Sequence, residues 1–564
     1  MSLRPSKTFG ENIEDILKEW ENAKIFSKEK LKLGKKKPSN GNYTYKIEDT
    51  ESELITKPKR GFERRTLNLT HPIPQSLLSL EISTNWPKIA TWIGRKQYSI
   101  DKTEPSHAGE RAISDIDFHL HSIKKDFIVS GSDWVVTTDI TRFYPSIYTH
   151  SIAWAAYGKA KTKSLLYTKQ HAGSLADRMD LLLRKSNLNQ TIGIPIGPDT
   201  SRIVADIISS RIDDDFKSLM QSASADQGRH KRVLPIRQNQ IDRLQDDWFI
   251  GTRTLDLAEQ ALSWISIAYR SYGLEINGAK TSVTRILNQE RETWATDLSH
   301  YLRSMSGGMS GTTLKGFLDQ VIHLQTIHKS SPVVSFAISA LESIDVSEAD
   351  APMVESFLIL GASIAPSHMD RICTALLNLE YATKTVSKNR IRERFVPLAE
   401  QHMELGNSFE TIWLLYALRG LRIKFISKKL ADLCEIYQGA TIPLVLLDMD
   451  QMQVFNSKLN KEAWEKGITK DTIRHDWTWL LGYEAFRHGW LTDKRNLMQE
   501  DFFRPLTQRN IVFYDEARNV KKSSALFKTR MAKGRKSSTL SKALLAQLTS
   551  TRLRLRAFLN DEAY

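Results

Sequence analysis

Two adjacent carboxylates, Asp246 and Asp247, lie near the turn of a predicted β-hairpin, with apolar residues on both sides. Charges of one sign this close raise one another's pKa, so the pair is costly at the tip of a buried hairpin unless a cation lies there. Mg²⁺ would remove that cost, because it is a hard ion that takes carboxylate oxygens. An Asp-Asp pair alone is more often a solvated turn, so the rest of the chain has to decide between these interpretations.

A third carboxylate follows a short β-branched run. Residues 133–140 have the composition of a buried strand, which ends at Asp139 and turns into a helix that starts near Tyr148. Farther along, a glycine-rich turn at 193–201 opens an amphipathic helix, and 255–272 has a second helical pattern. A carboxylate at the carboxyl end of a buried strand is well placed to face a site.

Both ends of the chain have simpler patterns. Residues 11–33 predict a charged amphipathic helix, and a basic loop follows to about residue 41. From roughly 310 to 515, strand patterns almost vanish and apolar residues recur with a period of about 3.6. We interpret this stretch as stacked helical hairpins of a solenoid, and a plain helical bundle fits nearly as well.

The formal net charge of +15 favours a polyanionic partner, with nucleic acid ahead of a membrane surface. A merely soluble basic protein would carry the same charge. Residues 521–556 contain eleven Lys or Arg and no Asp or Glu. Such a tail either holds phosphates or remains a disordered solubilising segment.

Membrane insertion and secretion are not expected. No apolar run reaches about 18 residues, and Met1 to Lys18 is too polar for a signal peptide. Cys373 and Cys434 lie in apolar helical patterns, which indicates buried, reduced thiols in a cytoplasmic protein.

The three carboxylates Asp139, Asp246 and Asp247 suit one kind of chemistry if the fold unites them. In two-metal phosphoryl transfer, one Mg²⁺ activates the attacking hydroxyl and the other holds the triphosphate and the leaving oxygen. The protein supplies hard anionic ligands, a basic surface for the triphosphate and a wall for the sugar. The chain has candidates for all of these parts.

The order of segments resembles the palm of reverse transcriptases over about 150 residues of the chain. The matching segments are 139–147 (Asp-Ile-Thr-Arg-Phe-Tyr-Pro-Ser-Ile) for motif A, 193–197 (Gly-Ile-Pro-Ile-Gly) with Ser201 for motif B, 244–247 (Leu-Gln-Asp-Asp) for motif C, and 273–277 (Gly-Leu-Glu-Ile-Asn) with Lys280 and Thr281 for motif D. The resemblance implies an α+β fold, with reverse-transcriptase fingers and palm built on an antiparallel palm sheet and followed by an all-α, HEAT-like helical-repeat domain. We expect an N-terminal helix and basic loop at 1–70, fingers and palm at 71–305, helical repeats at 306–515 and a basic tail at 516–564.

The resemblance also implies roles for single residues. Asp139, Asp246 and Asp247 would hold two Mg²⁺ ions, or Mn²⁺ in their place. Tyr144 would be the aromatic wall that excludes a ribose 2′-hydroxyl, which implies deoxynucleoside triphosphates as substrates. The residues expected at the nucleotide are Ile140, Phe143, Tyr144, Pro195, Gly197, Lys280, Lys96 and Arg111.

Two departures from the reverse-transcriptase motifs concern the nucleotide and not the metal ligands. Leu244 stands where motif C usually has Tyr, and Ile196 stands where motif B has Gln. Ile196 cannot make the polar contact that glutamine makes near the incoming nucleotide and the template. Templated copying is therefore in more doubt than nucleotidyl transfer itself.

A palm with these departures and a helical C-terminal region is similar to bacterial abortive-infection and unknown-group defence reverse transcriptases. That resemblance implies an antiphage role in the bacterial cytoplasm, untemplated DNA synthesis and a homo-oligomer. It also implies protein priming, with single-stranded DNA attached to a tyrosine, and Tyr43 and Tyr45 in the basic loop are the candidates. Two alternatives stay open: a retron- or intron-type enzyme that copies RNA, and an inactive nucleic-acid-binding scaffold.

Overall fold

The computed structural model describes residues 7–31, 42–59, 63–95, 97–101, 103–106, 111–167, 172–226, 234–288, 293–304, 310–342 and 346–517. Contacts divide them into two compact units, which we describe separately. The sheet unit comprises the described residues of 24–51 and 70–290, and the helical unit comprises those of 1–23, 52–69 and 291–539. The predicted N-terminal segment 1–70 is thus divided between the units, and nearly all of the predicted basic tail lies outside the described residues.

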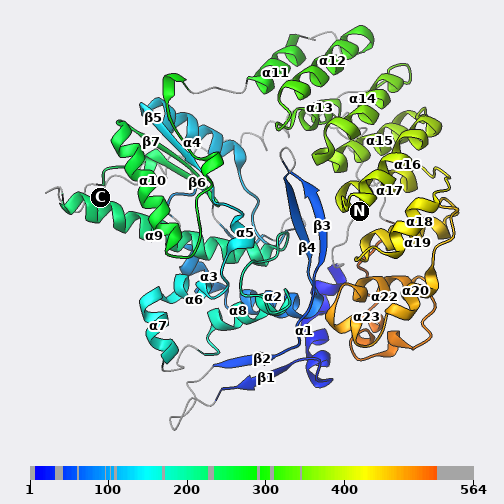
Figure 1. The fold of residues 1–564 in the computed structure, drawn as a ribbon, viewed down its shortest axis with the longest axis horizontal. Helices are drawn as coiled ribbons and strands as arrows, with labels where there is room; N and C mark the ends of the chain where they lie inside the picture. Colours follow the sequence, from blue (N-terminus) through cyan, green and yellow to red (C-terminus); the bar gives the residue numbers. More distant parts are fainter. Residues whose placement is uncertain are drawn as a thin grey trace, which may run out of the picture. The chain divides into compact units, whose positions relative to one another are not determined.

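The sheet unit is built on a four-stranded antiparallel sheet in the order β6-β7-β5-β8, drawn in Figure 1. Its strands are β5 (Trp134–Thr138), β6 (Ile241–Leu244), β7 (Asp247–Thr252) and β8 (Ser282–Arg285). The predicted buried strand and the predicted hairpin are confirmed as β5 and β6–β7. Val135 and Val136 of β5 are 1% and 0% exposed, which explains the apolar, β-branched sequence of this inner strand.

Three helices support the sheet. α4 (Phe118–Ser130) packs on β6 and β7, and α10 (Leu255–Arg270) packs on β5, β7 and β8. The Thr254 side chain caps α10 by accepting a hydrogen bond from the Leu257 N–H. α9 (Asp199–Asp226) packs against α10 and continues beyond the end expected from the sequence.

The other α-helices and strands of the sheet unit come before α9 in the sequence. They are the antiparallel hairpin of β1 (Ser27–Lys30) and β2 (Tyr43–Lys46), and the helices α2 (Pro72–Thr84), α3 (Trp86–Ile93), α5 (Phe143–Ser146), α6 (Ser151–Tyr157), α7 (Lys159–Tyr167) and α8 (Leu175–Lys185). The helix predicted over 11–33 is wrong in its second half. α1 (Lys7–Asn22) ends at Asn22, because Lys24 takes a left-handed φ of 60° and the chain then enters β1.

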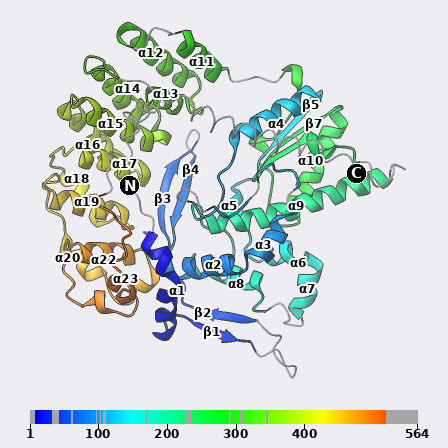
Figure 2. The ribbon, with the colours of Figure 1, turned by 180° about the vertical axis from the view of Figure 1, so that it is seen from behind.

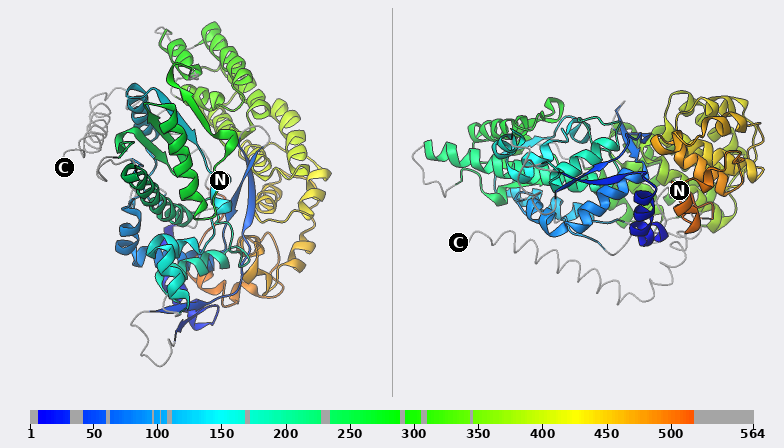
Figure 3. Two further views of the ribbon diagram at one scale, coloured as in Figure 1. Left: turned by 60° about the vertical axis from the view of Figure 1, so that its left-hand side comes forward. Right: turned by 90° about the horizontal axis from the view of Figure 1, so that it is seen from below.

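Helices make up most of the helical unit, as predicted for residues 310–515 (Figures 2 and 3). After α1 they are α11 (Trp294–Ser304), α12 (Gly311–Ile327), α13 (Val333–Leu341), α14 (Ala351–Ile364), α15 (Met369–Thr383), α16 (Lys388–Glu404), α17 (Ser408–Gly420), α18 (Lys428–Glu435), α19 (Thr441–Gln451), α20 (Lys461–Gly467), α21 (Thr472–His475), α22 (Thr478–Arg487) and α23 (Arg504–Gln508).

Some of these helices pack on the next helix in the sequence, as α14 does on α15 and α16 on α17, and others pack on the next but one. α13 packs on α15, α15 on α17, and α17 on α19. Such packing is expected of stacked helical hairpins. A HEAT-like repeat in the strict sense remains a prediction.

An antiparallel hairpin of β3 (Glu53–Pro58) and β4 (Arg64–Leu69) packs on α17. The Arg64 guanidinium donates to both carboxyl oxygens of the buried Glu410, at 2.8 and 2.6 Å. α1 is held in the same unit, since the Trp20 indole donates to the Phe502 carbonyl at 3.0 Å. The helical unit therefore depends on two short segments from the start of the chain.

Cys373 and Cys434 are buried and free, as predicted, and burial raises the pKa of both thiols. In the described part of the chain, no helix is both long and apolar enough to span a membrane.

Candidate functional site

The register of the sheet brings the predicted carboxylates to one end of it. Thr138 at the end of β5 pairs with Trp248 of β7, so Asp139 follows at the level of Asp247. Asp246 lies in the two-residue turn between Leu244 and Asp247, which pair with each other. Antiparallel pairing thus joins residues that are far apart in the sequence.

Asp139 and Asp246 are in direct contact through a hydrogen bond between their carboxyl groups. Burial, this hydrogen bond and the charges of Asp139 and Asp247 raise the pKa of Asp246 well above its usual range. Burial also works to raise the pKa of Asp139, but hydrogen bonds from Asp246 and Lys280 lower it overall. The two carboxyls therefore titrate in opposite directions from their usual range, with the Lys280 ammonium paired to Asp139.

The predicted motif D segment is bound to the motif A segment by its backbone. The Asn277 N–H donates to the Asp139 carbonyl at 2.7 Å, and the Thr141 N–H donates to the Glu275 carbonyl at 2.9 Å. Ile140, which is buried, forms an antiparallel bridge with Ile276. These bonds bring Lys280 to the carboxyl pair.

The predicted motif B turn is bound to the same region. The Ile194 N–H donates to the Tyr144 carbonyl at 3.0 Å, and the Gly193 N–H donates to the Ile147 carbonyl at 2.8 Å. Gly193 has a φ of 93°, and a Cβ there would lie 3.3 Å from the Pro145 carbonyl oxygen. Glycine is required at this position for both reasons.

The residues expected at the nucleotide occupy different environments. Tyr144 is half-buried, and its ring meets the buried Phe143 ring edge-on at 5.7 Å between centroids. Pro195 is buried in the motif B turn, and Gly197 is exposed, with a φ of 130°. Lys96 lies outside the described residues.

Arg111 is near Tyr144 but is engaged elsewhere. Its guanidinium forms an ion pair with Asp199 at the start of α9, and the hydrogen bond to Asp199 raises the pKa of Arg111, with a smaller contribution from Tyr144. The Ala112 N–H donates to the same carboxylate at 2.9 Å. Arg111 would have to exchange Asp199 for a triphosphate in order to bind it.

The carboxyl pair fits a divalent cation, although the full predicted ligand set is not assembled. Among the residues that the structure describes, no group of three or more His, Cys, Asp or Glu side chains is arranged to hold a metal ion. Asp247, the first residue of β7, is exposed. Mg²⁺ is usually bound by one or two carboxylates together with substrate phosphates, so Asp139 and Asp246 suffice as its protein ligands.

Tyr43 and Tyr45, the two candidate priming residues, lie on β2 and not in the basic loop predicted from the sequence. Both hydroxyls donate to the Glu81 carboxylate, which also receives the Arg178 guanidinium at 3.0 and 2.8 Å. Burial and the contact with Glu81 raise the pKa of both tyrosines. Alternating Tyr and Thr are in fact typical of a strand, but β2 has only four residues and pairs with β1 across a long basic connection, so the strand was not predicted.

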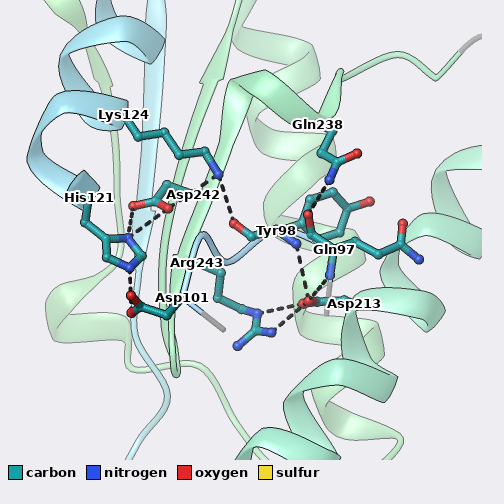
Figure 4. Close-up of polar contacts among 9 residues, drawn as sticks. All are labelled: Gln97, Tyr98, Asp101, His121, Lys124, Asp213, Gln238, Asp242 and Arg243. Carbon is teal, nitrogen blue, oxygen red and sulfur yellow. Dashed lines mark hydrogen bonds and ion pairs between the residues drawn. The ribbon is translucent and has the colours of Figure 1, made fainter. Parts of the chain in front are cut away.

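Behind the hairpin lies a buried ionic network that sequence reasoning missed (Figure 4). It contains three acids and three bases: Asp101, Asp242, Asp213, His121, Lys124 and Arg243. One signal was present in the sequence, because Asp242 and Arg243 stand in a short strand that is otherwise apolar. Charged residues in a buried strand indicate partners from other segments.

No protein-family model matches the chain, and no curated protein matches it. Among solved structures, the apo telomerase from Candida tropicalis aligns at 13% identity and a TM-score of 0.29, over 74% of this chain and 69% of that one. The telomerase from Candida tropicalis with a TWJ fragment of telomeric RNA aligns at 14% identity and a TM-score of 0.28, over 71% of this chain and 64% of that one. The corresponding complex from Candida albicans gives 12% identity and a TM-score of 0.24, over 60% and 65%. At these TM-scores the likeness carries no argument about activity, so the site rests on its own geometry.

Proposed function

We propose that this chain is a nucleotidyltransferase with a reverse-transcriptase-like palm, which adds deoxynucleotides to DNA. The observation that carries the proposal is the contact between the Asp139 and Asp246 carboxyls at one end of the sheet. Backbone hydrogen bonds join the segments that resemble motifs A, B and D around that contact. Two carboxyls in contact, one with its pKa raised by the other, are suited to bind a divalent cation between them.

In this proposal Asp139 and Asp246 hold Mg²⁺, with Asp247 beside them, and Mn²⁺ is an alternative. The bound ions would stabilise charge on the triphosphate and activate the attacking hydroxyl. Tyr144 forms the wall against the sugar, next to the Ile140 backbone. Lys280 and Arg111 are the cations available for the phosphates once each leaves its present carboxylate.

Replacing Asp246 by Asn tests the proposal directly. Asparagine keeps the volume and a hydrogen bond to Asp139 but is a poor cation ligand, so incorporation of labelled deoxynucleotides with Mg²⁺ should fall by at least about 10³-fold. Asp133→Asn is the matched control, because Asp133 precedes the opposite end of β5 and its side chain is 59% exposed. Retained incorporation in Asp246→Asn, at the level of the control, would contradict the site.

Untemplated, protein-primed synthesis is a finer part of the proposal, supported by Ile196 and Leu244 in place of the residues typical of templated enzymes. The product should then stay with the protein during phenol extraction. Tyr43→Phe or Tyr45→Phe should abolish that attachment if the Glu81 contact opens to release a hydroxyl. Free product that requires an added primer would favour templated synthesis by a retron- or intron-type enzyme.

The resemblance to defence reverse transcriptases supports a cellular role in abortive infection, a homo-oligomer, and single-stranded DNA or RNA as partners. Protection from phage by the wild-type chain, and its loss in Asp246→Asn, would test the role. The rival is an inactive scaffold, which is favoured by the absence of a three-ligand group among the described residues. Metal-dependent incorporation separates the two.

A further inference from the structure

Arg243 is among the largest fully buried side chains of the described residues, and it lies on β6, three residues before Asp246. Its Nε and Nη2 donate to the two oxygens of Asp213 on α9, at 2.6 and 2.7 Å. Asp213 is 0% exposed, as is the Arg243 side chain. A buried guanidinium is tolerated only when its donors are met in this way.

The remaining nitrogen of Arg243 reaches the hairpin turn. Nη1 donates to the Gln245 carbonyl at 2.6 Å. Gln245 has a left-handed φ of 56°, which is unfavourable for a residue with a Cβ and persists only where the surroundings hold it. The next residue is Asp246, so the conformation of Gln245 sets the direction in which the Asp246 carboxyl points.

The anchor of this contact is itself held on several sides, as Figure 4 shows. Asp213 accepts a further hydrogen bond from the Gln97 N–H at 3.0 Å, and the Arg243 N–H donates to the Tyr98 carbonyl at 3.1 Å. Lys124 of α4 donates to the same Tyr98 carbonyl at 3.1 Å and faces Asp242 at 3.5 Å. Arg243 is thus held to α9 through Asp213, and its backbone is linked to Lys124 of α4 through the Tyr98 carbonyl. The same guanidinium contacts the turn at Gln245.

We propose that Arg243 is a positioning residue for the transfer reaction: anchored on Asp213, it holds the Gln245 carbonyl and thereby sets the Asp246 carboxyl against Asp139. The inference rests on the proposed function for its kinetic consequence. The control of the cation-binding Asp246 carboxyl by Arg243 can be tested without catalysis, by measuring the affinity for a metal ion.

Arg243→Lys is the primary variant. A lysine keeps the charge beside Asp213 but cannot serve Asp213 and the Gln245 carbonyl together, because it lacks the planar fork. We expect about a 10- to 100-fold loss of kcat with KM for deoxynucleotide nearly unchanged, and about tenfold weaker binding of Mn²⁺ measured by electron paramagnetic resonance. Asp213→Asn should give the same pattern with smaller amplitude, which covers the case in which the lysine variant does not fold.

A second substitution separates positioning from mere stabilisation. Glycine adopts a positive φ without strain, so Gln245→Gly in the Arg243→Lys background should restore part of kcat and of Mn²⁺ affinity. His121→Gln is the matched control: it disturbs the same buried network away from the turn and should lower the melting temperature while leaving kcat and Mn²⁺ affinity unchanged.

The outcomes are distinct for the two claims. Wild-type Mn²⁺ affinity and wild-type kcat in folded Arg243→Lys, or no rescue by glycine, would overturn the positioning role. If the wild-type chain binds Mn²⁺ but incorporates no nucleotide, the proposed function is wrong. The positioning role is then decided by the Mn²⁺ affinities of the wild type and of Arg243→Lys. A wild-type chain that does neither would overturn both.

Discussion

Two groups of carboxyls meet at the β6–β7 hairpin, which contributes Asp242 to one group and Asp246 and Asp247 to the other, and they differ in how their charge is balanced. Behind the hairpin, Asp101, Asp242 and Asp213 face His121, Lys124 and Arg243, one base for each acid. At its tip, Asp139 forms an ion pair with Lys280, and the Asp139 and Asp247 charges raise the pKa of Asp246. The first group pairs each acid with a base, whereas at the tip two carboxyls lie against each other.

The titration behaviour of the two groups follows from this difference. Burial alone would lower the pKa of His121, but hydrogen bonds to Asp101 and Asp242, at 2.9 and 2.8 Å, raise it to about 9. In the tip group, burial and neighbouring carboxyls raise the pKa of Asp246 instead. A buried acid paired to a fixed base serves the structure, and a pKa raised by neighbouring carboxyls is the behaviour expected of a group that a cation would stabilise.

The largest expected effect separates the two groups by stability. Asp242→Asn should lower the free energy of unfolding at pH 7 by about 3 kcal/mol, because it leaves the buried Lys124 ammonium without its carboxylate and His121 with Asp101 alone. Asp246→Asn should leave that free energy unchanged or raise it, since it removes a carboxyl whose pKa burial and the neighbouring carboxyls raise in the folded chain. Urea unfolding measures both, and equal losses would show that the two groups are alike.

The balanced group should also confer a defined pH dependence. The folded pKa of His121, about 9, lies above its ordinary value of 6.5, so its contribution is complete below pH 6.5 and is lost as the pH rises through 9. We expect the wild-type chain to lose about 1.5 kcal/mol more than His121→Gln between pH 6.5 and 8. Burial lowers the pKa of Lys124 to about 8, which acts in the opposite direction at higher pH and sets the upper limit of the test. Parallel stability curves for the two proteins would contradict a protonated His121.

The smallest effect concerns the unbalanced group. Mg²⁺ at ten times its dissociation constant should stabilise the folded wild-type chain by about 1.4 kcal/mol. Asp246→Asn should show no such gain in melting temperature, while Asp242→Asn should keep it despite its lower starting stability. A gain in all three proteins would place the ion elsewhere.

The parts of the fold that were predictable are those with a local signal. β5 has a β-branched, apolar run, the β6–β7 hairpin has apolar residues around an acidic turn, and the stretch after residue 310 has helical periodicity. β1 was missed because its sequence, Ser-Lys-Glu-Lys, is mostly exposed and has no apolar alternation. Its partner β2 follows a long insertion, so no tight turn indicated a hairpin.

In the candidate site, too, the residues that could be predicted are those with a local signal. Asp139 and Asp246 were found because each adjoins a strand, and the register of the sheet then joins them. Arg243 and Asp213 were not, since the burial of a charged residue depends on a partner contributed by a distant helix. The local pattern of β6 indicates that Arg243 has a partner, but it does not say which distant residue that partner is.

The packing of β3, β4 and α1 in the helical unit has a consequence for the order of folding. Trp20 and its acceptor Phe502 are separated by 482 residues, and Arg64 and its partner Glu410 by 346. On the ribosome these early segments emerge long before the helices that cover them, and residues 70–290 can fold in between. Contacts of such long sequence separation form late and slowly. The nascent chain therefore carries uncovered apolar surface for most of its synthesis, and no single cut divides it into two self-sufficient fragments.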